Sequence, residues 1–136
     1  MENKELIRMA IDGLQYSYAP YSNFNVSAVL VAKNGTIFTG CNIENAGYTP
    51  TNCAERTAIF KAVSEGVKEF EKIVIVGGKN RKVESLTAPC GVCRQVMMEF
   101  CNPKTFKIVL AKSEDKYKEF TLEELLPLGF GPEDLK

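Results

Sequence analysis

Three cysteines occupy positions that could bring their thiols together around a metal ion. Cys90 and Cys93 lie three residues apart in the segment Pro89-Cys90-Gly91-Val92-Cys93, and Cys53 opens Cys53-Ala54-Glu55. Each segment is expected to begin a helix, so Cys90 and Cys93 share one helical face, and helix N-termini stabilise thiolates. If the two helix starts meet, three soft sulfur ligands converge, which is typical of zinc.

The two remaining cysteines decide whether such a site is closed or open. Structural zinc sites have four protein ligands, whereas catalytic sites keep the fourth position for water. Cys101 lies at the far end of the helix that Cys90 begins, roughly 16 Å of helical rise away, so it cannot join. Cys41 is expected in the middle of a strand, as a small buried hydrophobe. The sequence therefore favours an open, catalytic site.

Glu55 follows Cys53 by two residues and heads an otherwise apolar helical stripe that includes Ala58 and Ala62. Burying a carboxylate without a partner is costly, and burial raises its pKa. We therefore expect Glu55 to act as a proton shuttle near neutral pH. The alternative is a helix-start glutamate that only interacts with its own helix dipole.

Arg56 lies three residues from Cys53, within reach of the ligand sulfurs. Three thiolates around Zn²⁺ leave a net negative charge, which lowers the Lewis acidity of the metal. We expect the Arg56 guanidinium to donate hydrogen bonds to the thiolates and so restore electrophilicity. The alternative is an ordinary arginine on the helix surface.

The composition excludes several kinds of chemistry and partner. The 136 residues include no histidine, so no imidazole can serve as base or ligand. Seventeen basic residues balance 17 acidic ones, which argues against a nucleic acid polymer or an anionic membrane as partner. No apolar run approaches the about 20 residues of a membrane span, and the charged N-terminus lacks a signal-peptide core. An odd number of cysteines fits a cytoplasmic protein with reduced thiols.

Hydrophobic periodicity predicts the elements that position these residues. We expect helices over about 3–17, 53–65 and 90–101, strands over 24–32, 37–43, 73–76 and 106–111, an edge strand at 118–121 and a short helix after it. Asn34-Gly35 predicts a type I′ hairpin, and residues 77–88 a polar loop. The length fits one domain over residues 1–136. This order predicts a three-layer α/β/α fold with a mixed central sheet of about five strands.

The chain also resembles a known family. Cys53-Ala54-Glu55 followed by Pro89-Cys90-x-x-Cys93 resembles the zinc nucleoside deaminases, and more narrowly the chain looks like the small homotetrameric cytidine deaminases. The matching segments are Tyr18–Phe24, Gly40–Ala46, Cys90–Gln95 and Glu124–Pro127 with Phe130 after it.

The resemblance implies one zinc ion per subunit and the hydrolytic deamination of cytidine and 2′-deoxycytidine to the uridines plus ammonia, a step of pyrimidine salvage. Hydroxide generated at the zinc would attack C4, while Glu55 carries a proton to ring N3 and then to the departing amine. Deamination of another cytosine nucleoside, of the blasticidin S type, is an alternative. A non-catalytic structural zinc protein is another, and it predicts a fourth protein ligand.

The resemblance also implies the groups that bind the substrate. Asn42 and Glu44 would hydrogen-bond the ribose hydroxyls, Phe24 would lie against the pyrimidine, and the Ala54 backbone would contact the base. From residue type alone, Asn42 and Glu44 fit turn chemistry equally well, and Phe24 fits plain core packing.

Assembly is implied in the same way. In a homotetramer, Tyr48 and Phe130 would reach the active site of a neighbouring subunit and complete its pocket. Without the resemblance, Phe130 is only an aromatic residue in a Gly/Pro-rich segment, and its side chain needs other residues to shield it from water.

Overall fold

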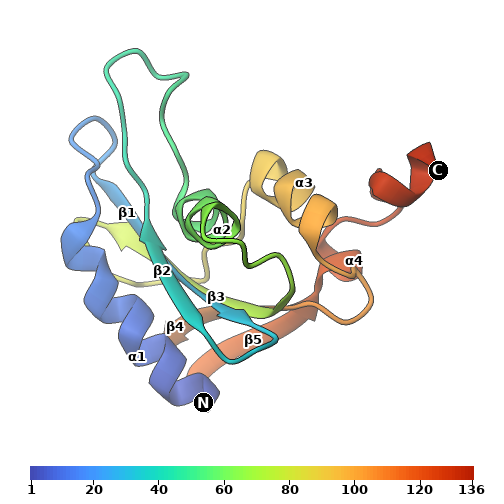
Figure 1. The fold of residues 1–136 in the computed structure, drawn as a ribbon. Coiled ribbons are helices and arrows are strands. Elements are labelled where there is room, and N and C mark those ends of the chain that lie inside the picture. The colour runs from blue at the N-terminus through green and yellow to red at the C-terminus, as the bar shows by residue number, and fades with distance from the viewer.

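One five-stranded sheet lies between two layers of helices in the structure, a computed structural model that describes residues 1–136 (Figure 1). The helices are α1 (Asn3–Gly13), α2 (Ala54–Ser64), α3 (Gly91–Phe100) and α4 (Leu122–Leu125), with the 3-10 turns η1 (Leu14–Tyr16) and η2 (Pro132–Leu135). The strands are β1 (Phe24–Ala32), β2 (Ile37–Cys41), β3 (Phe70–Lys79), β4 (Lys107–Ser113) and β5 (Lys116–Thr121). The predicted three-layer fold with a mixed sheet is confirmed.

The strand order is β2-β1-β3-β4-β5. Only β3 and β4 pair in parallel, with Ile73 opposite Ile108, and the other neighbours are antiparallel. A parallel pair needs a crossover connection, because the chain must return to the end of the sheet at which it started. Here α3 lies within that crossover, which places the start of α3 above the sheet.

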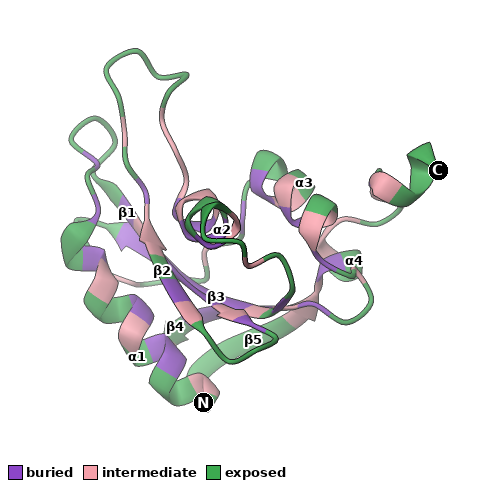
Figure 2. Cartoon of the chain, in the orientation of Figure 1, coloured by how far each residue is buried: buried purple, intermediate pink, exposed green.

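Strand β3 is buried on both faces, as its uninterrupted apolar run predicts (Figure 2). Ile73 and Ile75 belong to the core beneath α2 and α3, whereas Val74 and Val76 belong to the core beneath α1. Alternate residues of a strand face opposite sides, so one short run supplies both cores. Burying each of these side chains stabilises the fold by about 1.5–3 kcal/mol.

Helix α2 lies close to the sheet because the residues between them are small. A side chain at Gly40 would place its Cβ only 2.5 Å from the Ala54 carbonyl oxygen, and Ala58 and Ala62 are fully buried on the same side of the helix. This close approach places the start of α2, with Cys53 and Glu55, close to the sheet.

Strand β3 is longer than the sequence predicts, since it continues to Lys79 into the expected polar loop 77–88. Gly77 and Gly78 pair with Val26 and Asn25 of β1. Two glycines give no hydrophobic alternation, so their pattern could not predict a strand. Gly78 is required there because a Cβ would lie 1.9 Å from the Lys82 carbonyl oxygen.

The hairpin between β1 and β2 differs from the type I′ prediction. Gly35 has a φ of 90°, but Asn34 does not have the positive φ that a type I′ turn requires. The Asn34 side chain instead accepts a hydrogen bond from Thr36 N, and Ala32 N donates to Thr36 O. These bonds make a longer loop with glycine in the left-handed position.

Several element ends also differ from the expected ones. Helix α1 ends at Gly13 and continues as the turn η1, β2 ends at Cys41 instead of residue 43, and β5 already begins at Lys116. The capping box that opens α4 is confirmed: Glu124 N donates to Thr121 Oγ1, and Thr121 N donates to a Glu124 carboxylate oxygen. None of the helices combines the length and apolar character needed to cross a membrane.

Candidate metal centre and active site

The starts of α2 and α3 bring three thiols together. Cys53 and Cys90 are the N-cap residues of these helices, and both have extended backbone angles, while Cys93 lies in the first turn of α3. The Cys53 and Cys90 sulfurs are 3.7 Å apart, and the Cys90 and Cys93 sulfurs are 3.5 Å apart. All three sulfurs lie within 4.8 Å of one another.

The three thiols fit a zinc ion. Tetrahedral zinc with Zn–S bonds of about 2.3 Å separates its sulfur ligands by about 3.8 Å, which is close to the distances found between these sulfurs. No other cysteine, aspartate or glutamate joins the cluster. A set of three thiolates with no fourth protein ligand suits a catalytic zinc site and not a closed structural one.

The two other cysteines lie apart from this cluster. Cys101 is buried at the end of α3, and its burial raises the pKa of the thiol to about 12. Cys41 does not have the expected buried, mid-strand position. It is the last residue of β2, half-buried, and its thiol donates to the Tyr16 carbonyl oxygen at 3.3 Å. Because β2 is an edge strand, its end is only partly covered.

Arg56 contacts the thiol cluster directly. Its Nη2 donates to Cys53 Sγ at 3.3 Å. Hydrogen bonds from the Cys93 thiol and from Arg56 lower the pKa of Cys53 to about 5. The pKa of Cys93 is raised, because its thiol donates to Cys53 and is buried. The hydrogen bond to Cys53 likewise raises the pKa of Arg56, so the guanidinium stays charged beside the sulfur.

Two side chains that the sequence pattern does not single out, Thr57 and Arg94, hydrogen-bond to the backbone at the two helix starts. Thr57 Oγ1 donates to the Cys53 carbonyl oxygen at 3.1 Å and accepts from Asn52 Nδ2. Arg94 Nε donates to the Pro89 carbonyl oxygen at 2.7 Å. A neighbouring side chain thereby fixes the backbone carbonyl at each helix start. The only signal in the sequence for either side chain is the position of Arg94 directly after Cys93.

Glu55 is buried, as its place in the apolar stripe predicts. Only 3% of its surface is exposed. Desolvation, helped by the negative charge of a nearby Cys53 thiolate, raises the pKa of the Glu55 carboxyl to about 7. A carboxyl with this pKa can both take up and release a proton near neutral pH.

Glu55 and two of the thiols open onto one cavity of about 290 Å³. The predicted site residues that line it are Phe24, Asn42, Glu44, Cys53, Ala54, Glu55 and Cys90. Its other lining residues were missed: Ser22, Val26, Thr51, Asn52, Thr87 and Ala88. Two signals could have found some of them. Ser22 lies in the matched segment Tyr18–Phe24, and Thr87-Ala88 directly precede Pro89-Cys90.

The Glu44 carboxylate is held by the loop that precedes β1. One oxygen accepts from the backbone N–H groups of Tyr21 and Ser22 at 2.9 and 3.1 Å, and the other accepts from the Ser22 hydroxyl at 2.5 Å. These bonds, the Ser22 hydroxyl first, lower the pKa of Glu44 below its ordinary value. The cavity therefore presents an ionised carboxylate across the neutral pH range.

Comparison with known proteins decides the family. The family model described as "Cytidine and deoxycytidylate deaminase zinc-binding region" matches residues 1–110. The cytidine deaminase of Sporosarcina psychrophila is 45% identical over 135 residues, which cover 99% of this chain and 96% of that protein. The cytidine deaminase of Halalkalibacterium halodurans is 46% identical over 135 residues, covering 99% and 98%. The chain belongs to the cytidine deaminase family.

Solved cytidine deaminase structures share the fold. The crystal structure of the enzyme from Burkholderia pseudomallei superposes with a TM-score of 0.86 at 43% identity, covering 96% of this chain and 100% of that one. The Mycobacterium tuberculosis cytidine deaminase gives a TM-score of 0.81 at 31% identity, with 96% and 98% covered. The family model spans all three clustered cysteines, Glu55 and Arg56.

Neither Tyr48 nor Phe130 lines the cavity of its own chain. Tyr48 is 74% exposed and Phe130 is 58% exposed. The Tyr48 ring meets the Tyr21 ring edge-on at 6.4 Å, and Gln95 Nε2 donates to the Phe130 carbonyl oxygen. Both residues lie on segments that extend away from the layers, the β2–α2 connection and the C-terminal segment (Figure 1).

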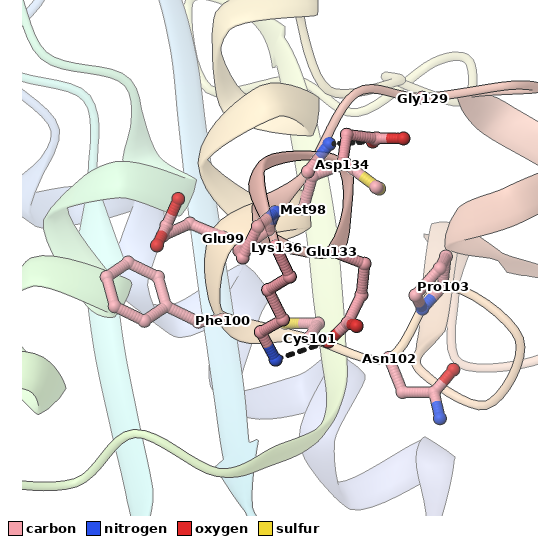
Figure 3. A pocket seen from close by; sticks show the side chains of 12 residues that line it. Met98, Glu99, Phe100, Cys101, Asn102, Pro103, Gly129, Glu133, Asp134 and Lys136 are labelled. Atoms are coloured by element: carbon pink, nitrogen blue, oxygen red, sulfur yellow. Dashed lines mark hydrogen bonds and ion pairs between the residues drawn. The ribbon is translucent and has the colours of Figure 1, made fainter.

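A larger cavity of about 700 Å³ lies between the end of α3 and the C-terminal segment (Figure 3). It is lined by Met98–Pro103, Gly129, Gly131–Asp134 and Lys136. Within it Lys136 pairs with Glu133, and the Asp134 carboxylate accepts a hydrogen bond from the Gly131 N–H. None of the clustered thiols lines it, and neither does Glu55, so size alone does not identify the active site.

Proposed function

We propose that the chain catalyses the hydrolytic deamination of cytidine and 2′-deoxycytidine to uridine and 2′-deoxyuridine, with release of ammonia. The observation that carries this proposal is the meeting of a three-thiol cluster and a buried carboxyl at one cavity. The relatives at 45% and 46% identity over nearly the whole chain are named cytidine deaminases, which supports the same reaction here. Production of uridine would place the chain in pyrimidine salvage.

Cys53, Cys90 and Cys93 would hold one zinc ion per subunit. Zinc supplies Lewis acidity, which lowers the pKa of a bound water molecule towards about 7 and so makes hydroxide available at neutral pH. The three sulfur ligands supply the negative charge that keeps the ion in place. The absence of a fourth protein ligand supports a catalytic role over a structural one.

Glu55 would move the protons of the reaction. Its carboxyl is desolvated, with a pKa of about 7, so neither protonation state is strongly favoured at neutral pH. As carboxylate it takes a proton from the attacking water and passes it to ring N3, which makes C4 more electrophilic. It then carries a proton to the departing amine. Positioned proton transfer of this kind contributes about 10²–10⁴-fold to the rate.

Arg56 would tune the metal without touching the substrate. Its guanidinium donates to Cys53 and withdraws electron density from that ligand. Three thiolates otherwise make the ion a weaker Lewis acid than a histidine-containing set would. A charged hydrogen-bond donor beside a ligand offsets this effect.

Four residues would bind the nucleoside. Asn42 and Glu44 would contact the ribose hydroxyls, Phe24 would pack against the pyrimidine, and the Ala54 backbone would contact the base. All four line the cavity that Glu55 opens onto, and Phe24 is 39% exposed instead of packed in the core. That exposure supports a ligand-facing role over plain core packing.

The chain would act as a homotetramer with shared active sites. Tyr48 and Phe130 are exposed on segments that project from the fold, and Leu128 beside Phe130 is fully exposed. Large apolar side chains in this setting are typical of protein interfaces.

Residues 1–136 would form one deaminase domain. The unpaired state of all five cysteines supports a cytoplasmic location for it.

A direct assay tests the proposed function. Purified protein is mixed with cytidine, 2′-deoxycytidine or blasticidin S, and the loss of ultraviolet absorbance reports deamination. Turnover of the first two, abolished by a chelator and restored by added Zn²⁺, is expected. The proposal would be refuted if turnover survived complete metal removal. It would also be refuted if the protein deaminated blasticidin S but neither cytidine nor 2′-deoxycytidine.

A further inference from the structure

A buried chain of hydrogen bonds leads from the β3–α3 connection to Asn42. The Arg81 backbone N–H donates to Asn25 Oδ1 at 3.1 Å, and Asn25 Nδ2 donates to Ser17 Oγ at 3.0 Å. The Ser17 hydroxyl then donates to Asn42 Oδ1. Ser17, Asn25 and Asn42 are only 4%, 4% and 8% exposed, so this is a polar network within the fold and not a surface one.

Backbone groups fix the direction of every bond in this chain. A backbone N–H can only donate and a carbonyl oxygen can only accept. Because the Arg81 N–H donates to Asn25, the oxygen of that amide faces Arg81 and its nitrogen faces Ser17. Because Val26 N donates to Asn42 Oδ1 and Asn42 Nδ2 donates to the Phe24 carbonyl oxygen, the Asn42 amide is fixed as well. Ser17 must therefore accept from Asn25 and donate to Asn42.

This network decides what Asn42 can offer a ligand. Its oxygen accepts from both Val26 and Ser17, so both lone pairs are used. Its nitrogen uses one hydrogen on the Phe24 carbonyl, which leaves one N–H free. Asn42 lines the cavity together with Glu44, whose charged carboxylate is an acceptor only. A group that both accepts and donates, such as a sugar hydroxyl, matches this pair.

Ser17 is also tied to the Asn42 segment through the backbone. Tyr18 N donates to the Asn42 carbonyl oxygen at 3.0 Å, and Glu44 N donates to the Tyr18 carbonyl oxygen at 2.8 Å. Arg81 holds the other side of Ser17, since its Nη2 donates to the Ser17 carbonyl oxygen at 3.4 Å. Ser17 is thus held on both sides while its hydroxyl faces Asn42.

We propose that Ser17 is a positioning residue for recognition of the sugar: it saturates the Asn42 oxygen and locks the amide with its free N–H available to a ribose hydroxyl. This inference rests on the proposed function, because it assumes a nucleoside in the cavity. Ser17 does not line that cavity, so it acts through Asn42 and not by contact with the substrate.

The test compares cytidine with 2′,3′-dideoxycytidine, which lacks both ribose hydroxyls of the ring. For Ser17→Ala, the ratio of kcat/KM for cytidine to kcat/KM for the dideoxy substrate is expected to fall about tenfold, as loss of one buried hydrogen bond implies. The fall should come mainly from a higher KM for cytidine. Should the alanine variant not fold, Ser17→Cys has the same shape with a weak donor and serves the same comparison.

Two further variants separate positioning from general damage. Ser64→Ala removes a serine hydroxyl that only bonds to the Lys61 carbonyl at the far end of α2, and it should leave the ratio unchanged. In an Asn42→Ala background, Ser17→Ala should have no further effect on the ratio, because the group through which Ser17 acts is gone.

The outcomes separate the positioning role of Ser17 from the proposed deaminase function. If the wild type deaminates cytidine and Ser17→Ala keeps the full preference for cytidine, or lowers both rates equally, the positioning role is overturned while the proposed function stands. If the wild type deaminates no cytosine nucleoside, the proposed function itself fails, and the inference fails with it.

Discussion

The Arg56 guanidinium lies 3.3 Å from the Cys53 sulfur, one helical turn away on α2. This contact places a permanent positive charge against a set of three thiols that would otherwise carry excess negative charge. The hydrogen-bond partners of the Arg56 side chain are sulfurs of this set, Cys53 first and Cys93 after it, and its Nε is buried without a partner. The arginine is therefore directed at the sulfur and not at a surface carboxylate.

Replacing Arg56 should weaken catalysis more than folding. For Arg56→Ala we expect kcat to fall about 10–100-fold, the range typical of residues that support metal ligands. Arg56→Lys keeps the positive charge but lacks the planar guanidinium, so its kcat should lie between those of the wild type and Arg56→Ala. Steady-state kinetics and zinc content per chain check both. Arg8→Ala, which removes a surface ion pair with Glu114, is the control. Full turnover with normal zinc content in Arg56→Ala would remove the tuning role.

Replacing Glu55 should separate binding from chemistry. Glu55→Gln keeps the shape of the side chain but can neither accept nor release a proton at neutral pH. We expect kcat to fall about 10²–10⁴-fold while zinc content and KM change little. Kinetics together with metal analysis measure this. A kcat near that of the wild type would exclude Glu55 as the proton carrier.

Glu44 should contribute stability that depends on pH in a defined direction. Its hydrogen bonds from Ser22 and Tyr21 lower its folded pKa, so its contribution is present above the ordinary pKa of about 4.3 and is lost as the pH falls through the folded value. The Tm difference between the wild type and Glu44→Gln should be largest at neutral pH and vanish in acid. Thermal unfolding from pH 7 to 3 tests this. A difference that persists or grows in acid contradicts the assignment.

The proposed sharing of active sites between subunits predicts complementation between inactive subunits. Glu55→Gln subunits provide an intact Phe130, and Phe130→Ala subunits provide an intact Glu55. Mixing the two under subunit exchange should restore part of the lost activity. Mixing Phe130→Ala with the double variant Glu55→Gln/Phe130→Ala should restore none. Equal activity in both mixtures would show that Phe130 does not act across subunits.

The sequence predicts the metal-binding part of the site well because that part is local. Cys90 and Cys93 are three residues apart, and the helical phase of Glu55 against Ala58 and Ala62 follows from one period. The meeting of the two helix starts is only a condition at the level of the sequence, and the structure fulfils it. These local expectations depend on short segments, and the structure brings the Cys53 sulfur next to those of Cys90 and Cys93.

Other features depend on packing that no short segment reveals. Cys41 was expected to be buried, but its position at the end of an edge strand leaves it half-buried. The extension of β3 depends on pairing of Gly77 and Gly78 with β1. The network of Ser17, Asn25 and Asn42 joins residues up to 25 positions apart. Their types fit ordinary turns, so only the folded structure identifies them as one unit.

The coordination of the metal in the purified protein tests the central claim most directly. X-ray absorption spectroscopy of the zinc-loaded protein counts its nearest neighbours and measures their distances. The proposed site predicts one zinc per chain with three sulfur neighbours at about 2.3 Å and a single light-atom neighbour. Four sulfur neighbours, or a protein that binds no zinc, would contradict it.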